Sequence, residues 1–390
     1  MNQKFLSNLF LKFFFYIIII TFNMEGYMFN KKLDIPLLVA VIFISIFGII
    51  MIYSSSSVWA LYKFEDSFKY VKNQTLFFII GLFLMYYISK ININFYKNKS
   101  NLILGLCFIL LVLVLIPGIG VVRNGARSWF GIGSFGIQPS EAAKIGLIIF
   151  VSKYLSNNKK EIKNIKQGVL PILAIILLFF GLIMLEPDFG TGMVMTLTLI
   201  VMLFVSGVKM SFFVKIGVLG LLGITGLIII APYRLERIIS FINPWSDPLG
   251  TGFQIIQSLY AIGPGGLLGM GFLNSRQKQF YLPEPQTDFI FSIISEEFGF
   301  LGVLIVCSFF VFIFYRIMKI SLKQTDLFAK YLSFGLSFGL ILQAMLNLMV
   351  VVGLIPVTGV TLPFLSYGGS SLLVSMASIG IVLNISRKNV

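Results

Sequence analysis

The chain has 390 residues, of which 57% are hydrophobic and only 12% are charged, and its mean hydropathy is +0.95. Soluble globular proteins carry about 25% charged residues, and no single water-soluble core could hide this much apolar surface. The composition therefore excludes a soluble protein and predicts an all-α polytopic membrane protein. The net charge of +15 does not indicate a nucleic-acid partner, because the basic residues lie in short loops between apolar stretches.

The chain contains no His, and its two cysteines, Cys107 and Cys307, both lie in apolar stretches. These facts exclude a His-ligated zinc site, a Ser-His-Asp triad and a disulfide framework. Any acid–base chemistry must then come from Asp, Glu, Lys or Tyr.

Residues 1–30 form an N-terminal extension. Residues 5–22 are apolar, but they precede a second plausible start at Met28. The stretch is either a signal-like or additional membrane segment, or an upstream extension that is absent from the natural product. No small-residue cleavage site follows it, which favours the second interpretation. Residues 31–390 are predicted to form a single transmembrane domain.

A membrane-spanning helix needs about 20 mostly apolar residues. Ten stretches of the chain fit that description, at 35–54, 74–90, 101–117, 139–156, 168–185, 190–206, 212–231, 289–315, 329–351 and 368–385.

Basic residues predict the orientation of these ten spans. With Lys31 on the cytoplasmic side, the inner loops hold twice as many Lys and Arg residues as the outer loops. Both ends of the ten-span core are then cytoplasmic, and the long loop 232–288 between spans seven and eight is extracytoplasmic. Within that loop, 254–262 has an apolar face and predicts a short helix, which either lies on the outer membrane surface or packs against the protein.

The loop ends at Asp288, directly before the apolar run of span eight. A carboxylate at the mouth of a membrane helix costs free energy unless it is solvated or paired, so it marks a functional site. A helix N-terminus also favours the ionised form, which both a general base and a metal ligand require. Asp288 is therefore the first candidate for catalysis.

Three other stretches carry candidate residues. Arg127 could hold a pyrophosphate or simply bind lipid phosphate, and Trp129 could equally belong to an interfacial aromatic belt. Glu141 and Lys144 share a helix face, so they form either a structural ion pair or one wall of a substrate cavity. Two Pro/Gly-rich segments at 353–371 predict irregular backbone that faces a cavity.

These motifs together resemble the SEDS family (shape, elongation, division, sporulation). The resemblance rests on NGARSW at 124–129, QPSEAAK at 138–144, PDFGT at 187–191, YLPEPQTDFIFSIISEEFGFLG at 281–302 and GLIPVTGVTLPFLSYGGSS at 353–371. It covers nearly all of 31–390, and the segment 252–291 is more similar to the FtsW and SpoVE branch than to RodA. Residues 1–27 have no counterpart in the family.

The resemblance implies a peptidoglycan glycosyltransferase of the bacterial cytoplasmic membrane. The implied substrate is lipid II, and the implied partner is a monofunctional class B penicillin-binding transpeptidase within a division or sporulation complex. The family's essential outer-loop Asp corresponds to Asp288, and its intramembrane Glu and Lys correspond to Glu141 and Lys144. Gln286 stands where many members have His.

Several further expectations follow for the site. Substrate-binding roles are expected for Arg127, Trp129, Glu141, Lys144, Gln286, Ser366 and Tyr367. A divalent cation, Mg²⁺ or Mn²⁺, fits the combination of carboxylates and a pyrophosphate, with Asp288 as the candidate ligand. A lipid flippase and a non-catalytic scaffold for the transpeptidase remain as alternatives, because polar residues within spans and broken helices also occur in transporters.

Overall fold

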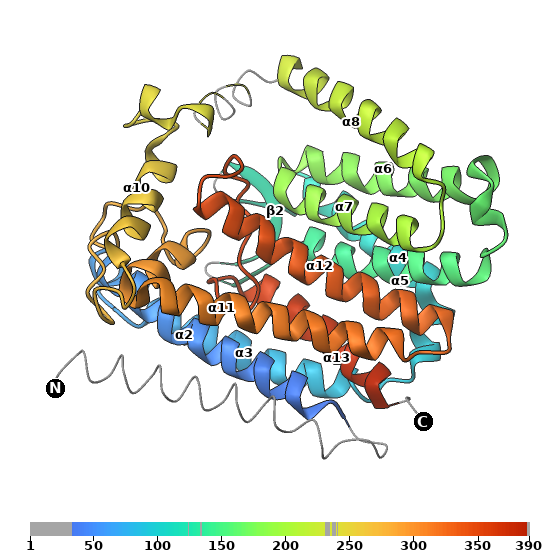
Figure 1. The fold of residues 1–390 in the computed structure, drawn as a ribbon, viewed down its shortest axis with the longest axis horizontal. Coiled ribbons are helices and arrows are strands. Elements are labelled where there is room, and N and C mark those ends of the chain that lie inside the picture. Colours follow the sequence, from blue (N-terminus) through green and yellow to red (C-terminus); the bar gives the residue numbers. More distant parts are fainter. Residues whose placement is uncertain are drawn as a thin grey trace. The chain divides into compact units, whose positions relative to one another are not determined.

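The computed structural model describes residues 33–387 except 124, 133–134, 231–234, 236–238 and 240. The predictions for residues 1–30 therefore lie outside the described residues. In the part that is described, ten α-helices fall at the ten predicted places (Figure 1). They are α2 (Ile35–Phe64), α3 (Lys69–Ile88), α4 (Ile93–Leu115), α5 (Pro139–Asn157), α6 (Leu170–Leu185), α7 (Phe189–Val205), α8 (Met210–Ile230), α11 (Ile290–Leu322), α12 (Leu327–Val351) and α13 (Gly369–Arg387).

Seven of the described helical segments are both long and apolar enough to cross a membrane, which confirms a multi-pass helical membrane protein. They are α2, α3, α4, Ile165–Leu185, α11, α12 and α13. Two further apolar segments, Phe189–Val205 and Met210–Gly220, are shorter. The count of ten spans stays a prediction.

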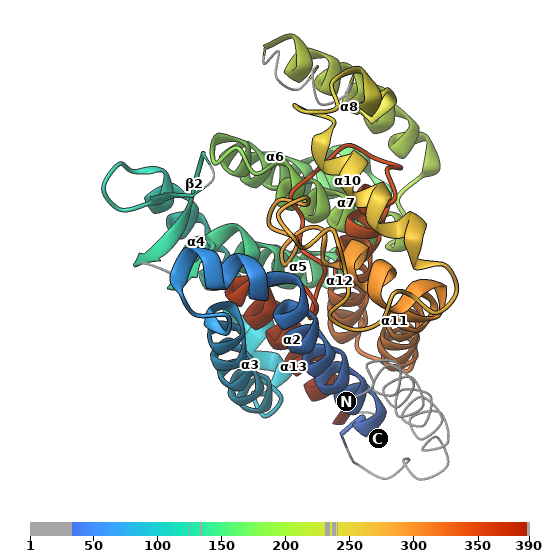
Figure 2. The same cartoon turned by 90° about the vertical axis from the view of Figure 1, so that its left-hand side faces the viewer.

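The expectation of purely helical structure is wrong between α4 and α5. Three short antiparallel strands lie there, β1 (Val121–Arg123), β2 (Ala126–Ile132) and β3 (Phe135–Ile137), paired in the order β1-β2-β3 (Figure 2). This stretch contains β-branched and aromatic residues, which favour strands. Gly125, with a φ of 81°, supplies the turn between β1 and β2.

The chain divides into two compact units, each of which is described by itself. The first comprises the described residues within 1–80, 232–316 and 343–368, and the second comprises the described residues within 81–231, 317–342 and 369–390. Three of the boundaries fall inside α3, α11 and α12, so neither unit is a separate stretch of chain.

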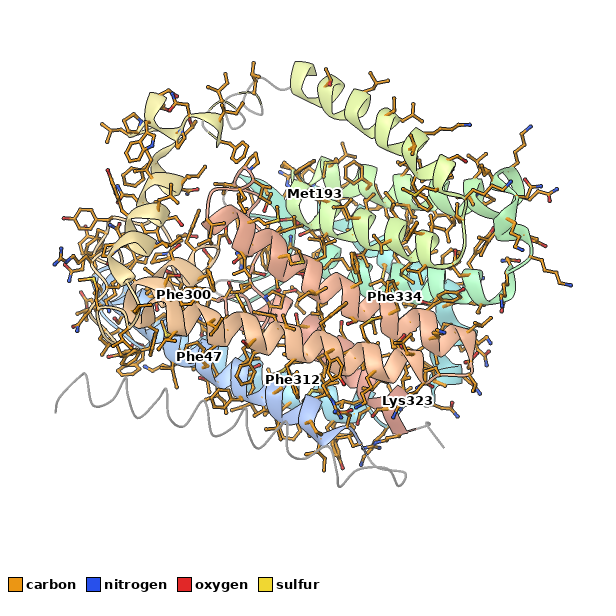
Figure 3. The ribbon with its side chains drawn as sticks, in the orientation of Figure 1. Phe47, Met193, Phe300, Phe312, Lys323 and Phe334 are labelled. Atoms are coloured by element: carbon orange, nitrogen blue, oxygen red, sulfur yellow. The ribbon has the colours of Figure 1, made fainter. Side chains whose placement is uncertain are left out.

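In the first unit, α2 and α11 lie side by side (Figure 1). Phe47 of α2, labelled in Figure 3, packs edge-on against Phe298 with the ring centroids 5.9 Å apart. At one end of the helix pair, Arg316 donates to the Asp34 carboxylate over 2.8 Å. Asp34 also caps α2 by accepting a hydrogen bond from the Leu37 amide.

The long loop between α8 and α11, in the first unit, contains the predicted short helix, α10 (Phe253–Ile262), followed by the 3₁₀ turn η5 (Gly263–Gly265). Ile255 and Ile256 are buried, and the Ser258 hydroxyl donates to the carbonyl of Val351 over 2.7 Å. Of the two predicted placements for this helix, the contacts show the one packed against protein. Another 3₁₀ turn, η4 (Pro244–Ser246), precedes α10.

The predicted irregular backbone near the C-terminus is confirmed, because no helix covers 352–368. This segment packs tightly against α2. A Cβ on Gly48 would lie 2.5 Å from the carbonyl oxygen of Phe364, so only a glycine allows the two backbones to meet there.

In the second unit, α4 and α5 also approach closely. A Cβ on Gly146 would lie 2.6 Å from the sulfur of Cys107, and small residues at such crossings are typical of membrane helices. The short helices η2 (Glu161–Lys163) and η3 (Ile165–Val169) lead from α5 into α6.

Candidate functional site

Asp288 lies two residues before the first residue of α11, which confirms that it precedes a long apolar helix. Its side chain is partly exposed, and its Oδ2 is near Gly359, where an added Cβ would come within 3.9 Å. Free amides at a helix start favour negative charge nearby. The local structure therefore suits an ionised carboxylate that can reach a ligand.

The backbone around Asp288 is held at three consecutive carbonyls. The Tyr367 amide donates to the carbonyl of Gln286 over 2.8 Å, and the Ser366 hydroxyl donates to that of Thr287 over 2.6 Å. The side-chain amide of Asn347 donates to the Asp288 carbonyl over 2.8 Å. Three successive fixed carbonyls leave the peptide units beside Asp288 little freedom to rotate.

Two of these donors, Ser366 and Tyr367, are themselves held in place by residues of α3. The side-chain amide of Gln74 donates to the Ser366 carbonyl over 3.2 Å, while its oxygen accepts from the Gly368 amide over 3.2 Å. The ring of Tyr367 meets the ring of Tyr70 edge-on with centroids 4.9 Å apart. The predicted pair Ser366 and Tyr367 thus lies against the Asp288 backbone, and direct substrate contact by either residue stays a prediction.

Gln286 is buried, and its side-chain oxygen Oε1 accepts no hydrogen bond from the residues that the structure describes. A buried amide oxygen without a partner costs free energy. This polar atom two residues from Asp288 is consistent with the predicted substrate-binding role.

The second unit contains the predicted pair on α5. Lys144 Nζ lies 3.0 Å from Glu141 Oε1, and the two side chains are only 11% and 7% exposed. The other oxygen, Glu141 Oε2, has no hydrogen-bond partner among the described residues. The ion pair is confirmed, and the remaining oxygen is available to a further donor.

Arg127 and Trp129 lie on β2, in the same unit. The Arg127 Nη1 donates weakly to the carbonyl of Leu115 over 3.4 Å, and its buried Nε has no described partner. The guanidinium of Arg123 lies 5.1 Å from the centroid of the Trp129 ring, a cation–π contact. The strands therefore present two arginines and an indole at the end of α4.

A further acidic pair lies in the hairpin between α6 and α7. The Asp188 carboxylate caps α7 by accepting from the Thr191 amide and also accepts from the Gln138 side chain over 2.6 Å. Glu186 is fully buried, and neither of its oxygens has a described hydrogen-bond partner. Burial, with a smaller contribution from the Asp188 charge, raises the pKa of Glu186 to about 8, and the nearby Ser140 hydroxyl offsets part of that shift.

Sequence reasoning missed Asn347, Gln343 and Gln74 as residues of the Asp288 region. Asn347 also donates to the Val360 carbonyl over 2.8 Å, and Gln343 donates to that of Thr361 over 3.1 Å. The sequence did contain a signal for these three residues, because an amide side chain in an otherwise apolar span needs a hydrogen-bond partner inside the protein.

Sequence comparisons agree with the motifs. The family model described as "Cell cycle protein", which covers FtsW, RodA and SpoVE, matches residues 35–390. Stage V sporulation protein E of Bacillus subtilis is 51% identical over 91% of this chain and 97% of its own length. The probable peptidoglycan glycosyltransferase FtsW of Geobacter sp. strain M18 is 40% identical over 94% of this chain and 98% of its own.

Solved structures share the fold. A chain from work on "Structural coordination of polymerization and crosslinking by a peptidoglycan synthase complex" aligns with a TM-score of 0.76 at 31% identity, over 92% of this chain and 98% of that one. The rod shape determining protein RodA of Thermus thermophilus aligns with a TM-score of 0.67 at 28% identity, over 92% of this chain and 97% of that one.

Proposed function

Because this chain belongs to the FtsW, RodA and SpoVE family of cell-cycle proteins, we propose that it is a peptidoglycan glycosyltransferase with Asp288 as its catalytic base. The observation that carries the assignment of Asp288 is its setting. A partly exposed carboxylate stands before a helix N-terminus on backbone that is held at three consecutive carbonyls. Preorganised groups of this kind are what catalysis requires.

The substrate we propose is lipid II, the lipid-linked disaccharide-pentapeptide carried on undecaprenyl pyrophosphate. Asp288 removes the proton from the acceptor hydroxyl while the hydroxyl oxygen forms a bond to the anomeric carbon of the donor sugar. The bond from that carbon to the pyrophosphate oxygen breaks, and the pyrophosphate leaves with the electron pair. Arg127 and Lys144 supply cationic groups suited to such a leaving group.

We include a divalent cation, Mg²⁺ or Mn²⁺, in this proposal. No group of three or more His, Cys, Asp or Glu side chains gathers among the described residues, so these residues offer no closed metal site. Magnesium is commonly held by one or two carboxylates together with substrate phosphates. Asp288 is the protein ligand that we propose for such a shared ion.

The partner we propose is a class B penicillin-binding transpeptidase in a division or sporulation complex. The support is the similarity to a chain of a peptidoglycan synthase complex that coordinates polymerisation with crosslinking. The identity of 51% to a stage V sporulation protein supports the sporulation setting.

We expect Asp288→Asn to insert normally and bind the transpeptidase while glycan polymerisation falls at least about 100-fold, the low end for losing a general base. Asn has nearly the size and capping ability of Asp but lacks its charge and basicity. The measurement is the polymer ladder formed by the purified complex with lipid II and a divalent cation. Asp247→Asn is the matched control, because among the described residues that loop carboxylate accepts hydrogen bonds only from 250 and 251.

Normal ladders from Asp288→Asn would refute the role of Asp288. The same assay separates the alternatives. A non-catalytic scaffold forms no polymer, either alone or with a transpeptidase whose active site has been inactivated. A flippase moves lipid II across the membrane of vesicles without polymerising it.

We also propose ten spans with both ends cytoplasmic and the loop 232–288 outside, supported by the ten helices and the distribution of Lys and Arg. In a background without Cys107 and Cys307, Leu249→Cys should react with an impermeant maleimide on intact cells, since Leu249 is 88% exposed. Lys160→Cys should remain unlabelled until the cells are opened. The reverse pattern would place Asp288 on the wrong side for lipid II polymerisation.

A further inference from the structure

The helix that follows Asp288 is broken after about two and a half turns. Gly299, inside α11, has a φ of 62° and a ψ of −159°, a backbone conformation that is open almost only to glycine. The break leaves residues 290–298 as a short helix. Helices of this length are marginal alone, and their terminal amides and carbonyls need other partners.

The loop segment 265–271, which we call the brace, supplies those partners. Two brace amides donate to the carbonyls that end the short helix, and two brace carbonyls accept from the amides that begin the next one. The bonds are Met270 N to Glu296 O (2.9 Å), Gly271 N to Glu297 O (3.0 Å), Phe300 N to Gly266 O (2.9 Å) and Leu301 N to Leu267 O (3.2 Å). The brace therefore satisfies both sides of the break in α11.

Glycines are required where the brace meets the helix. A Cβ on Gly269, whose φ is 78°, would lie 2.2 Å from the Glu297 carbonyl oxygen, and one on Gly265 would lie 2.2 Å from that of Ser295. By contrast, a Cβ on Gly263, which has a φ of −55°, would meet nothing within 4 Å. The chain thus offers a matched pair of glycines, Gly269 in the brace and in tight contact, and Gly263 before the brace in open space.

The acidic side chains of Glu296 and Glu297, at the end of the short helix, bind the segment 275–278 that follows the brace. Glu296 accepts hydrogen bonds from the Arg276 amide over 2.8 Å and from the Ser275 hydroxyl over 2.5 Å. Glu297 Oε1 lies 3.0 Å from Lys278 Nζ and accepts from the Ser54 hydroxyl of α2 over 2.6 Å. We call Glu296, Glu297 and Lys278 the clasp.

All three clasp residues are almost fully buried, and the Lys278 and Glu297 side chains are 4% and 0% exposed. A buried ion pair is a weak source of net stability, but removing one partner leaves an uncompensated charge at a high cost. The clasp therefore resists any movement that would separate 275–278 from the short helix.

We propose that the brace and the clasp are positioning elements that set the place of Asp288. The inference rests on the proposed catalytic role of Asp288 and adds residues that act through it. Asp288 lies two residues before the first residue of the short helix, so the direction of that helix determines where the carboxylate points. The brace and the clasp hold the opposite end of the same short helix, so they hold its direction.

The test compares Gly269→Ala with Gly263→Ala in the full-length protein bound to its transpeptidase. We expect Gly269→Ala to speed hydrogen exchange at the amides of 270, 271, 300 and 301, and to lower kcat for lipid II polymerisation by about 100-fold, the loss typical of a misplacement near 1 Å. KM should change little, because binding groups elsewhere are untouched. Gly263→Ala should match the wild type in both measurements.

A second set of variants covers the case in which Gly269→Ala fails to fold. Glu297→Gln keeps an oxygen that can accept from Ser54 but leaves Lys278 buried without its counter-charge, so exchange at 270 and 271 should rise and kcat should fall. Adding Lys278→Met removes the stranded charge and should recover most of the protection and of kcat. A purely structural role would lower the thermal stability of Glu297→Gln and leave kcat of the folded complex unchanged.

A normal kcat in Gly269→Ala or Glu297→Gln, together with fast exchange at 270 and 271, would overturn the inference. Equal exchange in Gly269→Ala and Gly263→Ala would overturn it as well. The proposed function is refuted by a different result, normal polymerisation by Asp288→Asn. The two proposals are therefore tested by different variants.

Discussion

Replacing Asn347 by Leu should damage both the stability and the activity of this protein. The side-chain amide of Asn347 donates to two carbonyls, those of Asp288 and Val360, each over 2.8 Å. Leucine has the same branched shape and the same number of heavy side-chain atoms but no donor, so it leaves both carbonyls without a partner. The substitution therefore tests whether the Asn347 amide holds the backbone of the proposed catalytic residue.

The expected size follows from these two bonds. Leaving one buried carbonyl unsatisfied costs about 1–3 kcal/mol, so two cost about 2–6 kcal/mol. The value should fall in the lower part of this range, because the bond to the Asp288 carbonyl is only partly buried. Loss of the bond at Asp288 should also lower kcat by about tenfold or more, since small displacements of a catalytic group are costly.

Asn384→Leu is the control. Its side-chain amide donates to one carbonyl, that of Ser89, over 2.7 Å, and its Oδ1 lacks a described partner just as that of Asn347 does. Thermal unfolding in detergent should show a loss of about 1–3 kcal/mol for this variant, with kcat unchanged. If both variants lose stability but neither loses kcat, the idea that Asn347 positions Asp288 is refuted.

Two further predictions concern the second unit. Exchanging the charges in Glu141→Lys with Lys144→Glu should restore the folding lost in either single variant but not polymerisation, because we expect Glu141 Oε2, which lacks a described partner, to bind substrate. Full activity of the exchange variant would show a purely structural pair. The pKa of Glu186, raised to about 8 by burial, should make the wild type lose stability as the pH rises from about 4.5 toward 8, because the folded state holds a proton that the unfolded state has released. Glu186→Gln should abolish this pH dependence. Near pH 8 it should be more stable than the wild type by a few kcal/mol, since each pKa unit corresponds to about 1.4 kcal/mol. An unchanged slope of unfolding free energy against pH in Glu186→Gln would contradict this prediction.

The helices could be read from the sequence because a membrane leaves few alternatives. A backbone in hydrocarbon must satisfy its own hydrogen bonds, so long apolar stretches form helices wherever they occur. The ten predicted stretches accordingly coincide with helices. Asp288, Glu141 and Lys144 were equally visible, because charged residues in or beside apolar spans stand out from their surroundings.

Sequence patterns predicted the structure less well where strand pairing or tertiary packing determines the conformation. The sheet at 121–137 escaped prediction because its strands are short and each depends on pairing with the next. The short helix α10 could lie on lipid or on protein, and only the contacts of Ser258 with Val351 and Ser292 decide that it packs on protein.

Tertiary structure alone decided which distant residues serve Asp288. Asn347, Ser366 and Tyr367 are 59 or more positions away in sequence, yet they supply the donors for three consecutive carbonyls. The glycines and acids near 269 and 297 were visible as a pattern, but their interlock across the break in α11 was not. Hydrophobicity depends on each residue's own side chain and can be read along the chain, whereas a hydrogen bond between distant groups exists only once folding has brought both partners within about 3 Å.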